Sequence, residues 1–144
     1  MAVDLVVVAL RRHAVRLTLV RRAVLEVLLH SPFALSGSEI EKQLAPAADR
    51  ITLYRTLRTF EEKGLVHRVV DHSETVRYAV YARPTAVAAA SPATTDHVHF
   101  KCTACQHIYC LSQVPVPAVV LPGRYHTERR DYLLSGICER CQSS

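Results

Sequence analysis

The chain has 144 residues and 49% of them are hydrophobic, so it can bury a core in one domain or in two small ones. Its apolar run at residues 5–10 is too short to cross a bilayer and lacks the flanks of a signal peptide, which predicts a cytoplasmic protein with no membrane partner. The net charge is +5, most of it in residues 1–84, which is compatible with a polyanion partner or with a solvated basic surface.

Two helices are predicted in the N-terminal part. In residues 17–31 apolar residues recur at helical spacing, Thr18 can cap the start, and Pro32 closes the segment. The next helix begins where Ser36 and Glu39 have the spacing of a capping box. Only a short connection therefore separates these two helices.

A third helix and a β-hairpin follow. Asp49 can cap the helix and Gly64 is its C-terminal stop. The hydrophobic period then changes to two, and residues 65–71 and 75–81 are β-rich runs joined by a short turn. Helix, turn, helix and hairpin is the order of a winged helix-turn-helix DNA-binding domain, predicted here over residues 1–83.

A second, smaller domain is predicted beyond a linker. Residues 84–96 are rich in Ala, Pro, Ser and Thr and have no sustained apolar face, as is typical of a hinge linker. Residues 97–144 predict strands at 97–102 and 107–111 and a last strand within 125–137. The predicted fold class is therefore α+β, with the winged-helix domain followed by a small α/β dimerisation domain.

Four of the five cysteines form two Cys-x-x-Cys pairs that 32 residues separate: Cys102, Cys105, Cys138 and Cys141. Disulfides or a thioredoxin-like redox pair are the alternatives, but a cytoplasmic chain disfavours the first. A redox pair would begin a helix, whereas each pair here ends a strand. The spacing predicts a closed, structural Zn²⁺ site with four thiolate ligands.

A second group of metal ligands lies beside the first. Alternation along the strand puts His97 and His99 on one face, away from the four-cysteine site. If the return strand pairs Cys110 with His99, its thiol joins the two imidazoles, and His67 or His72 can supply a fourth ligand. Imidazole and thiolate favour Zn²⁺. The alternative is that the two histidines line a domain interface without a metal.

Several motifs together resemble the ferric uptake regulator (Fur) superfamily of metal-responsive repressors. These are "LTLVRRAVL", "ITLYRTLRTFEEKGLVHRV", "HVH" before "CTAC", and the terminal "GICERC". The resemblance runs from about residue 16 to the end. It implies a homodimer that binds an AT-rich pseudo-palindromic operator in double-stranded DNA when a regulatory metal occupies the hinge.

The resemblance also implies a set of DNA-binding residues. It places Tyr54 and Arg55 in the major groove, Arg16 in the minor groove and Arg21 on the backbone. Thr52 lies with Arg55 on the face of the third helix opposite its apolar stripe, and Arg58 on the same helix is a further candidate contact. For Arg55 and Arg58 the alternative is a solvated helix surface.

Two departures from the family pattern bear on the metal. Ala34 stands where iron and peroxide sensors place a hinge histidine, and Ala79, or Tyr81 in another register, stands where a further ligand is expected. The ligands that remain favour a zinc uptake regulator: His67, His97, His99 and Cys110. The alternatives are an iron- or peroxide-responsive member and a structural-zinc DNA binder with no metal sensing.

An enzyme is not expected. A hydrolytic zinc needs an open coordination position and a nearby general base. No Glu or Asp is placed beside "HVH" in the manner of a His-Glu-x-x-His helix.

Overall fold

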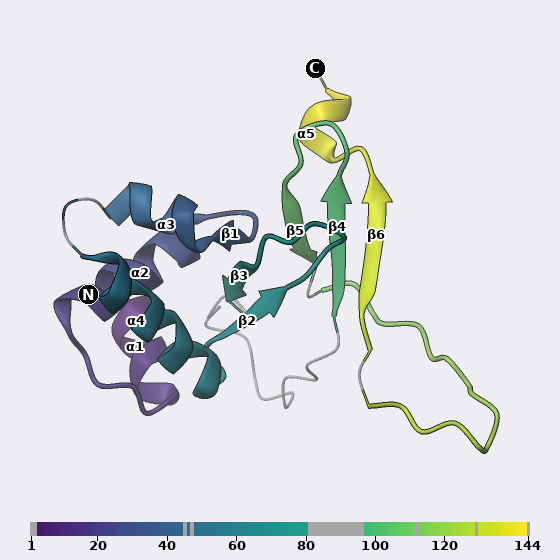
Figure 1. Cartoon of the computed structure of the whole chain (residues 1–144), viewed down its shortest axis with the longest axis horizontal. Coiled ribbons are helices and arrows are strands. Elements are labelled where there is room, and N and C mark those ends of the chain that lie inside the picture. Colours follow the sequence, from purple (N-terminus) through teal and green to yellow (C-terminus); the bar gives the residue numbers. More distant parts are fainter. Residues whose placement is uncertain are drawn as a thin grey trace. The chain divides into compact units, whose positions relative to one another are not determined.

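The computed structural model describes residues 3–44, 46, 48–80, 97–111, 113–128 and 130–143, which belong to two compact units (Figure 1). Both units combine helix and sheet, so the predicted α+β class is confirmed. The predicted linker at 84–96 lies outside the described residues. None of the helices in this part of the chain has the length and apolar character needed to span a bilayer.

Helix α1 (Leu5–Arg12) opens the N-terminal unit and has no counterpart among the predicted helices. The Asp4 carboxylate caps it by accepting from the amides of Val6 and Val7 at 3.1 and 3.2 Å. At its other end Ala14 has a φ of 55°, and the amide of Val15 donates to the carbonyl of Leu10 at 2.9 Å. The helix thus ends in a Schellman-type turn in which alanine takes the left-handed position that glycine prefers.

Helices α2 (Leu19–His30) and α3 (Gly37–Leu44) have the predicted caps. The Thr18 hydroxyl accepts from the amide of Arg21 at 3.2 Å. Ser36 and Glu39 cap each other reciprocally: the Ser36 amide donates to the Glu39 carboxylate at 2.8 Å and the Glu39 amide donates to the Ser36 hydroxyl at 3.2 Å. Both predicted starts are therefore confirmed to the residue.

Helix α4 (Arg50–Glu62) begins at Asp49, whose carboxylate accepts from the amide of Thr52 at 2.6 Å. Its last helical residue is Glu62, Lys63 is the C-cap, and Gly64 follows with a φ of 75°. The amide of Leu65 donates back to the carbonyl of Phe60 at 2.8 Å, which completes the glycine stop. The apolar faces of the helices bury one shared core whose largest members include Phe60, Leu10, Leu25, Ile40, Leu53 and Leu57.

A three-stranded sheet closes the N-terminal unit. Its order is β1 (Leu35–Ser36), β3 (Arg77–Val80) and β2 (Val66–Val69), all antiparallel. Strands β2 and β3 are the predicted hairpin. The short strand β1 was not predicted. In the β2–β3 ladder His67 lies opposite Ala79.

The C-terminal unit contains a second three-stranded sheet, with β4 (Val98–Cys102) between β5 (Ile108–Leu111) and β6 (Tyr132–Gly136) (Figure 1). Strand β5 is antiparallel to β4 and β6 is parallel to it. The short helix α5 (Glu139–Gln142) follows β6. All three strands fall where they were predicted, and this sheet positions both groups of metal ligands.

Candidate metal sites and nucleic-acid interface

The parallel pairing of β4 and β6 brings the four cysteines together. Cys102 is the last residue of β4 and lies opposite Gly136, the last residue of β6, so that Cys138 follows only two residues later. The Sγ atoms of Cys102, Cys105, Cys138 and Cys141 all lie within 4.8 Å of one another. Two Cys-x-x-Cys pairs that 32 residues separate in sequence therefore form one group.

The spacing of these sulfur atoms suits a tetrahedral ion. The Sγ atoms of Cys105 and Cys138 are 3.9 Å apart. A tetrahedron of sulfur atoms with Zn–S bonds of about 2.3 Å has edges of about 3.8 Å. The four residues fit Zn²⁺ in both donor type and separation.

Hydrogen bonds to the sulfur atoms favour thiolates at two of the four positions. The amides of Cys105 and Cys138 donate to Cys102 Sγ at 3.5 and 3.4 Å, and these bonds lower the pKa of Cys102 to about 6. The pKa of Cys138 is lowered by the amide of Cys141 and by the hydroxyl of Tyr109. The hydrogen bond to Cys138 raises the pKa of Cys141 to about 12. Protons are thus shared within the group, and a divalent cation can replace them.

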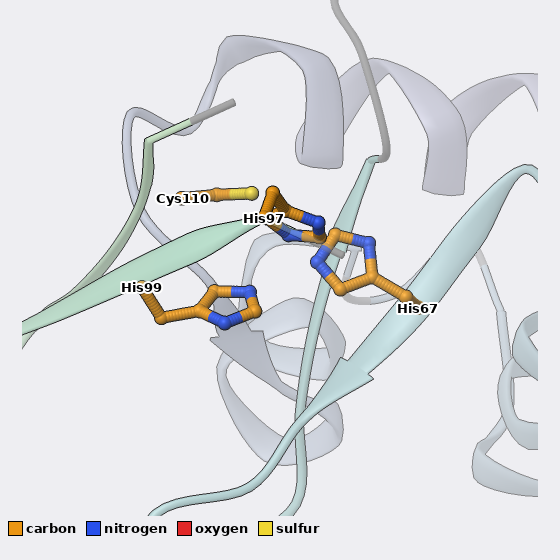
Figure 2. A group of neighbouring side chains, drawn as sticks. All are labelled: His67, His97, His99 and Cys110. Atoms are coloured by element: carbon orange, nitrogen blue, oxygen red, sulfur yellow. The ribbon is translucent and has the colours of Figure 1, made fainter. Parts of the chain in front are cut away.

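His97, His99 and Cys110 form the second group within this unit (Figure 2). His99 on β4 lies opposite Cys110 on β5, which is the register that the sequence reasoning required for the thiol to join the two imidazoles. The imidazole centroids of His97 and His99 are 4.3 Å apart, and the ligand atoms of the three residues lie within 4.8 Å of one another. His67, also labelled in Figure 2, belongs to β2 of the N-terminal unit.

Burial sets the protonation of this group. It lowers the pKa of His99 to about 4, with the neighbouring His97 adding to the effect, so the imidazole is neutral at pH 7 and can donate a lone pair. Burial also raises the pKa of the Cys110 thiol to about 12. A cation would lower the pKa of that thiol and make it a ligand. The set is soft, with two imidazoles, one sulfur and no carboxylate.

The two alanines that depart from the family pattern are both buried in the N-terminal unit. Ala34 is 2% exposed and Ala79 is 8% exposed. The ladder places Ala79 opposite His67, while Tyr81 lies outside the described residues. Neither methyl group can bind a metal.

Three of the predicted DNA-binding residues are exposed on α4. Tyr54 is 43% exposed, and Arg55 and Arg58 are also exposed. Arg58 forms an ion pair with Glu62, from Nε to Oε1, at 3.1 Å. Thr52 is half-buried and its amide serves the Asp49 cap. Within the described part of the chain Arg55 has no carboxylate at ion-pair distance.

The other two predicted DNA-binding residues lie just before α2 and in its first turn. Arg16 is exposed in the segment between α1 and α2, and Arg21 is half-buried. The guanidinium of Arg21 donates to the backbone carbonyl of Arg16 at 3.0 Å, which orders this segment. The structure therefore holds all six residues in the N-terminal unit, with four of them exposed: Arg16, Tyr54, Arg55 and Arg58.

Sequence reasoning missed one residue of the four-cysteine group. The Tyr109 hydroxyl donates to Cys138 Sγ at 3.6 Å. The available signal was its position beside Cys110 on a strand, because alternation turns Tyr109 toward the face opposite Cys110.

A basic helical unit joined to a unit with two groups of soft ligands has the make-up of a metal-binding transcription regulator. The family model described as "Ferric uptake regulator family" matches residues 12–118, well over half of the chain, and the chain belongs to this family. It is a metal-responsive, DNA-binding transcription regulator of a family whose members act as dimers, and it is not an enzyme.

Solved structures share the fold at low sequence identity. The Vibrio cholerae ferric uptake regulator has a TM-score of 0.57 at 19% identity, covering 90% of this chain and 97% of its own. The Helicobacter pylori regulator, described as having three functional metal binding sites, has a TM-score of 0.55 at 18% identity and coverages of 95% and 89%. A zinc-bound manganese uptake regulator has a TM-score of 0.59 at 15% identity and coverages of 92% and 98%. No curated protein matched the sequence.

Proposed function

We propose that the chain is a zinc-responsive repressor of the zinc uptake regulator type, which acts in the cytoplasm as a homodimer on an AT-rich pseudo-palindromic operator. The observation that carries this proposal is the soft ligand group of His97, His99 and Cys110. Two imidazoles and a thiolate suit Zn²⁺ better than Mn²⁺ or Fe²⁺, for which carboxylate ligands are the more usual choice.

Two zinc sites are proposed. Cys102, Cys105, Cys138 and Cys141 hold a structural Zn²⁺ with no open position. His97, His99 and Cys110 hold the regulatory Zn²⁺, and His67 on β2 is the proposed fourth ligand. When bound, the regulatory ion supplies a positive centre that all four donors share. Its binding to residues of both domains provides the free-energy link between zinc and DNA affinity.

The domain roles follow from the proposed sites. Residues 1–83 are the winged helix-turn-helix domain, residues 84–96 the hinge linker, and residues 97–144 the metal-binding dimerisation domain. Helix α4 is the proposed recognition helix, since it exposes Tyr54, Arg55 and Arg58 together. Arg16 precedes α2 and contacts the minor groove, and Arg21 in the first turn of α2 contacts the DNA backbone. Arginine can sit in a narrow A·T groove, which agrees with an AT-rich operator.

A second candidate is a DNA binder that keeps the structural zinc but does not sense metal. The buried methyl groups of Ala34 and Ala79 favour it, because they stand where other members are expected to place ligands. The same two alanines disfavour an iron- or peroxide-responsive member, which needs further histidine or carboxylate ligands.

The test begins with DNA sequences that the protein selects from a random pool in the presence of zinc. Fluorescence anisotropy then measures affinity for the selected duplex while free Zn²⁺, Fe²⁺ or Mn²⁺ is varied. We expect zinc to raise the affinity at the lowest free concentration, and His99→Ala to abolish the zinc response. His126→Ala, in an exposed segment of the C-terminal unit, is the matched control. Equal affinity with zinc and with chelator would leave the non-sensing binder as the function.

A further inference from the structure

Strand β5 carries a tyrosine and a cysteine that serve different faces of one sheet. Cys110 lies opposite His99 and Tyr109 lies opposite Phe100. The hydroxyl of Tyr109 is 3.6 Å from the Sγ of Cys138, which lies 29 residues further along the chain. We propose that Tyr109 is a positioning residue of the four-cysteine site, whose O–H group donates a hydrogen bond that orients Cys138 Sγ and slows the loss of zinc. This inference rests on the proposed structural zinc.

Charge explains why such a donor matters. Four thiolates around one Zn²⁺ carry a net charge of about −2. Cys102 is fully buried and Cys138 is 7% exposed, so water offsets little of the charge on these two sulfur atoms, while Cys105 and Cys141 are half-buried. Cys102 accepts two backbone N–H donors, from Cys105 and Cys138. Cys138, in the second Cys-x-x-Cys pair, accepts from the amide of Cys141 and from the Tyr109 hydroxyl, which is the one side-chain donor among these hydrogen bonds.

The direction of the effect follows from the sulfur lone pairs. A hydrogen bond donated to a bound thiolate withdraws electron density from the sulfur. The sulfur is then less readily protonated and less nucleophilic. Protonation of the sulfur and its reaction as a nucleophile are two routes by which a thiolate leaves the metal, so both become slower. Without this bond we expect zinc to leave the four-cysteine site faster.

Packing and hydrogen bonding can be separated at this position. Tyr109 is half-buried on the middle of β5. Tyr109→Phe keeps the ring and removes only the oxygen. Tyr125→Phe is the matched control, because Tyr125 is 70% exposed on the segment that connects β5 to β6.

The first measurement is zinc release from full-length protein to a colorimetric chelator at pH 7. We expect Tyr109→Phe to release zinc about 10-fold faster or more, the lower end of the range typical for a lost hydrogen-bond partner of a ligand, and Tyr125→Phe to match the parent. Equal release rates in all three proteins would overturn the inference. A parent protein that holds no zinc would instead refute the proposed structural site.

The second measurement is the absorption of protein loaded with Co²⁺ in place of zinc. A thiolate that loses a hydrogen-bond donor is easier to oxidise, so its charge-transfer band to cobalt moves to longer wavelength. We expect this shift in Tyr109→Phe alone. Faster release with an unshifted band would mean that the hydroxyl serves only the packing of the sheet, and the positioning role would be rejected.

Discussion

Arg58 is the proposed DNA contact that already forms an ion pair within its own helix. Its Nε lies 3.1 Å from Glu62 Oε1, and the two side chains are 80% and 62% exposed. An exposed pair at this helical spacing stabilises the protein by roughly 0.4 kcal/mol. If Arg58 leaves Glu62 to bind a DNA phosphate, the free energy of that ion pair is lost. This loss weakens the association constant for DNA by about 2-fold.

Glu62→Gln is therefore expected to tighten DNA binding about 2-fold or more at low salt. Removing a negative charge from the DNA-facing surface adds to the loss of competition. The helix itself should tolerate the change, because Glu62 lies in the last turn of α4, where a negative charge opposes the helix dipole.

Anisotropy titrations on the zinc-selected duplex at 50 mM and 500 mM salt would measure this effect. Glu26→Gln is the control, since Glu26 on α2 makes the same change in net charge but pairs with Arg22, outside the proposed interface. We expect the gain for Glu62→Gln to disappear at high salt. Unchanged or weaker binding at 50 mM salt would show that Arg58 does not face the DNA.

Three further predictions concern stability. Ala14→Gly should raise the free energy of unfolding by about 1 kcal/mol in a urea titration, because glycine accepts the φ of 55° without strain; a loss of stability would contradict this. Thr18→Ala should lower it by about 1 kcal/mol through loss of the α2 cap, whereas an unchanged urea midpoint would show that the cap is dispensable. The amide of Val7 and then Arg22 hold the pKa of Asp4 below its usual 3.8. The stability that ionised Asp4 contributes is therefore present above pH 3.8 and is lost as pH falls through the lowered pKa. Asp4→Asn should reduce the loss of unfolding free energy between neutral and acid pH. The same loss in parent and variant would refute a role for the Asp4 carboxylate.

The parts of the fold that the sequence predicted correctly are set by local chemistry. The side chains of Ser36 and Glu39 each accept a hydrogen bond from the other's backbone amide. Gly64 terminates α4 because its backbone takes a positive φ. Helix α1 was missed because residues 5–10 form a continuous apolar run in which no polar residue marks the exposed face; the structure buries Val6, Ala9 and Leu10 in the shared core. Strand β1 has two residues and exists through its pairing with β3, which no local pattern encodes.

The candidate sites also combine features that local sequence predicts with features that depend on contacts between distant segments. The Cys-x-x-Cys spacing and the alternation along β4 were enough to separate the cysteines from the histidines. The pairing of His99 with Cys110 was only a condition in the sequence reasoning, and the register of β4 and β5 meets it. The contact of Tyr109 with Cys138 depends on the parallel register of β4 and β6, which joins distant segments. His67 as a fourth ligand stays a prediction, because it belongs to the other compact unit.

The central claim is a labile zinc at the histidine group beside a permanent zinc at the cysteines. The most direct test counts zinc per chain in full-length protein before and after a mild chelator, with DNA affinity measured on the same samples. We predict two zinc ions falling to one, together with a loss of operator binding that added zinc restores. A single zinc that neither falls with chelator nor rises with added zinc, at constant DNA affinity, would contradict the account.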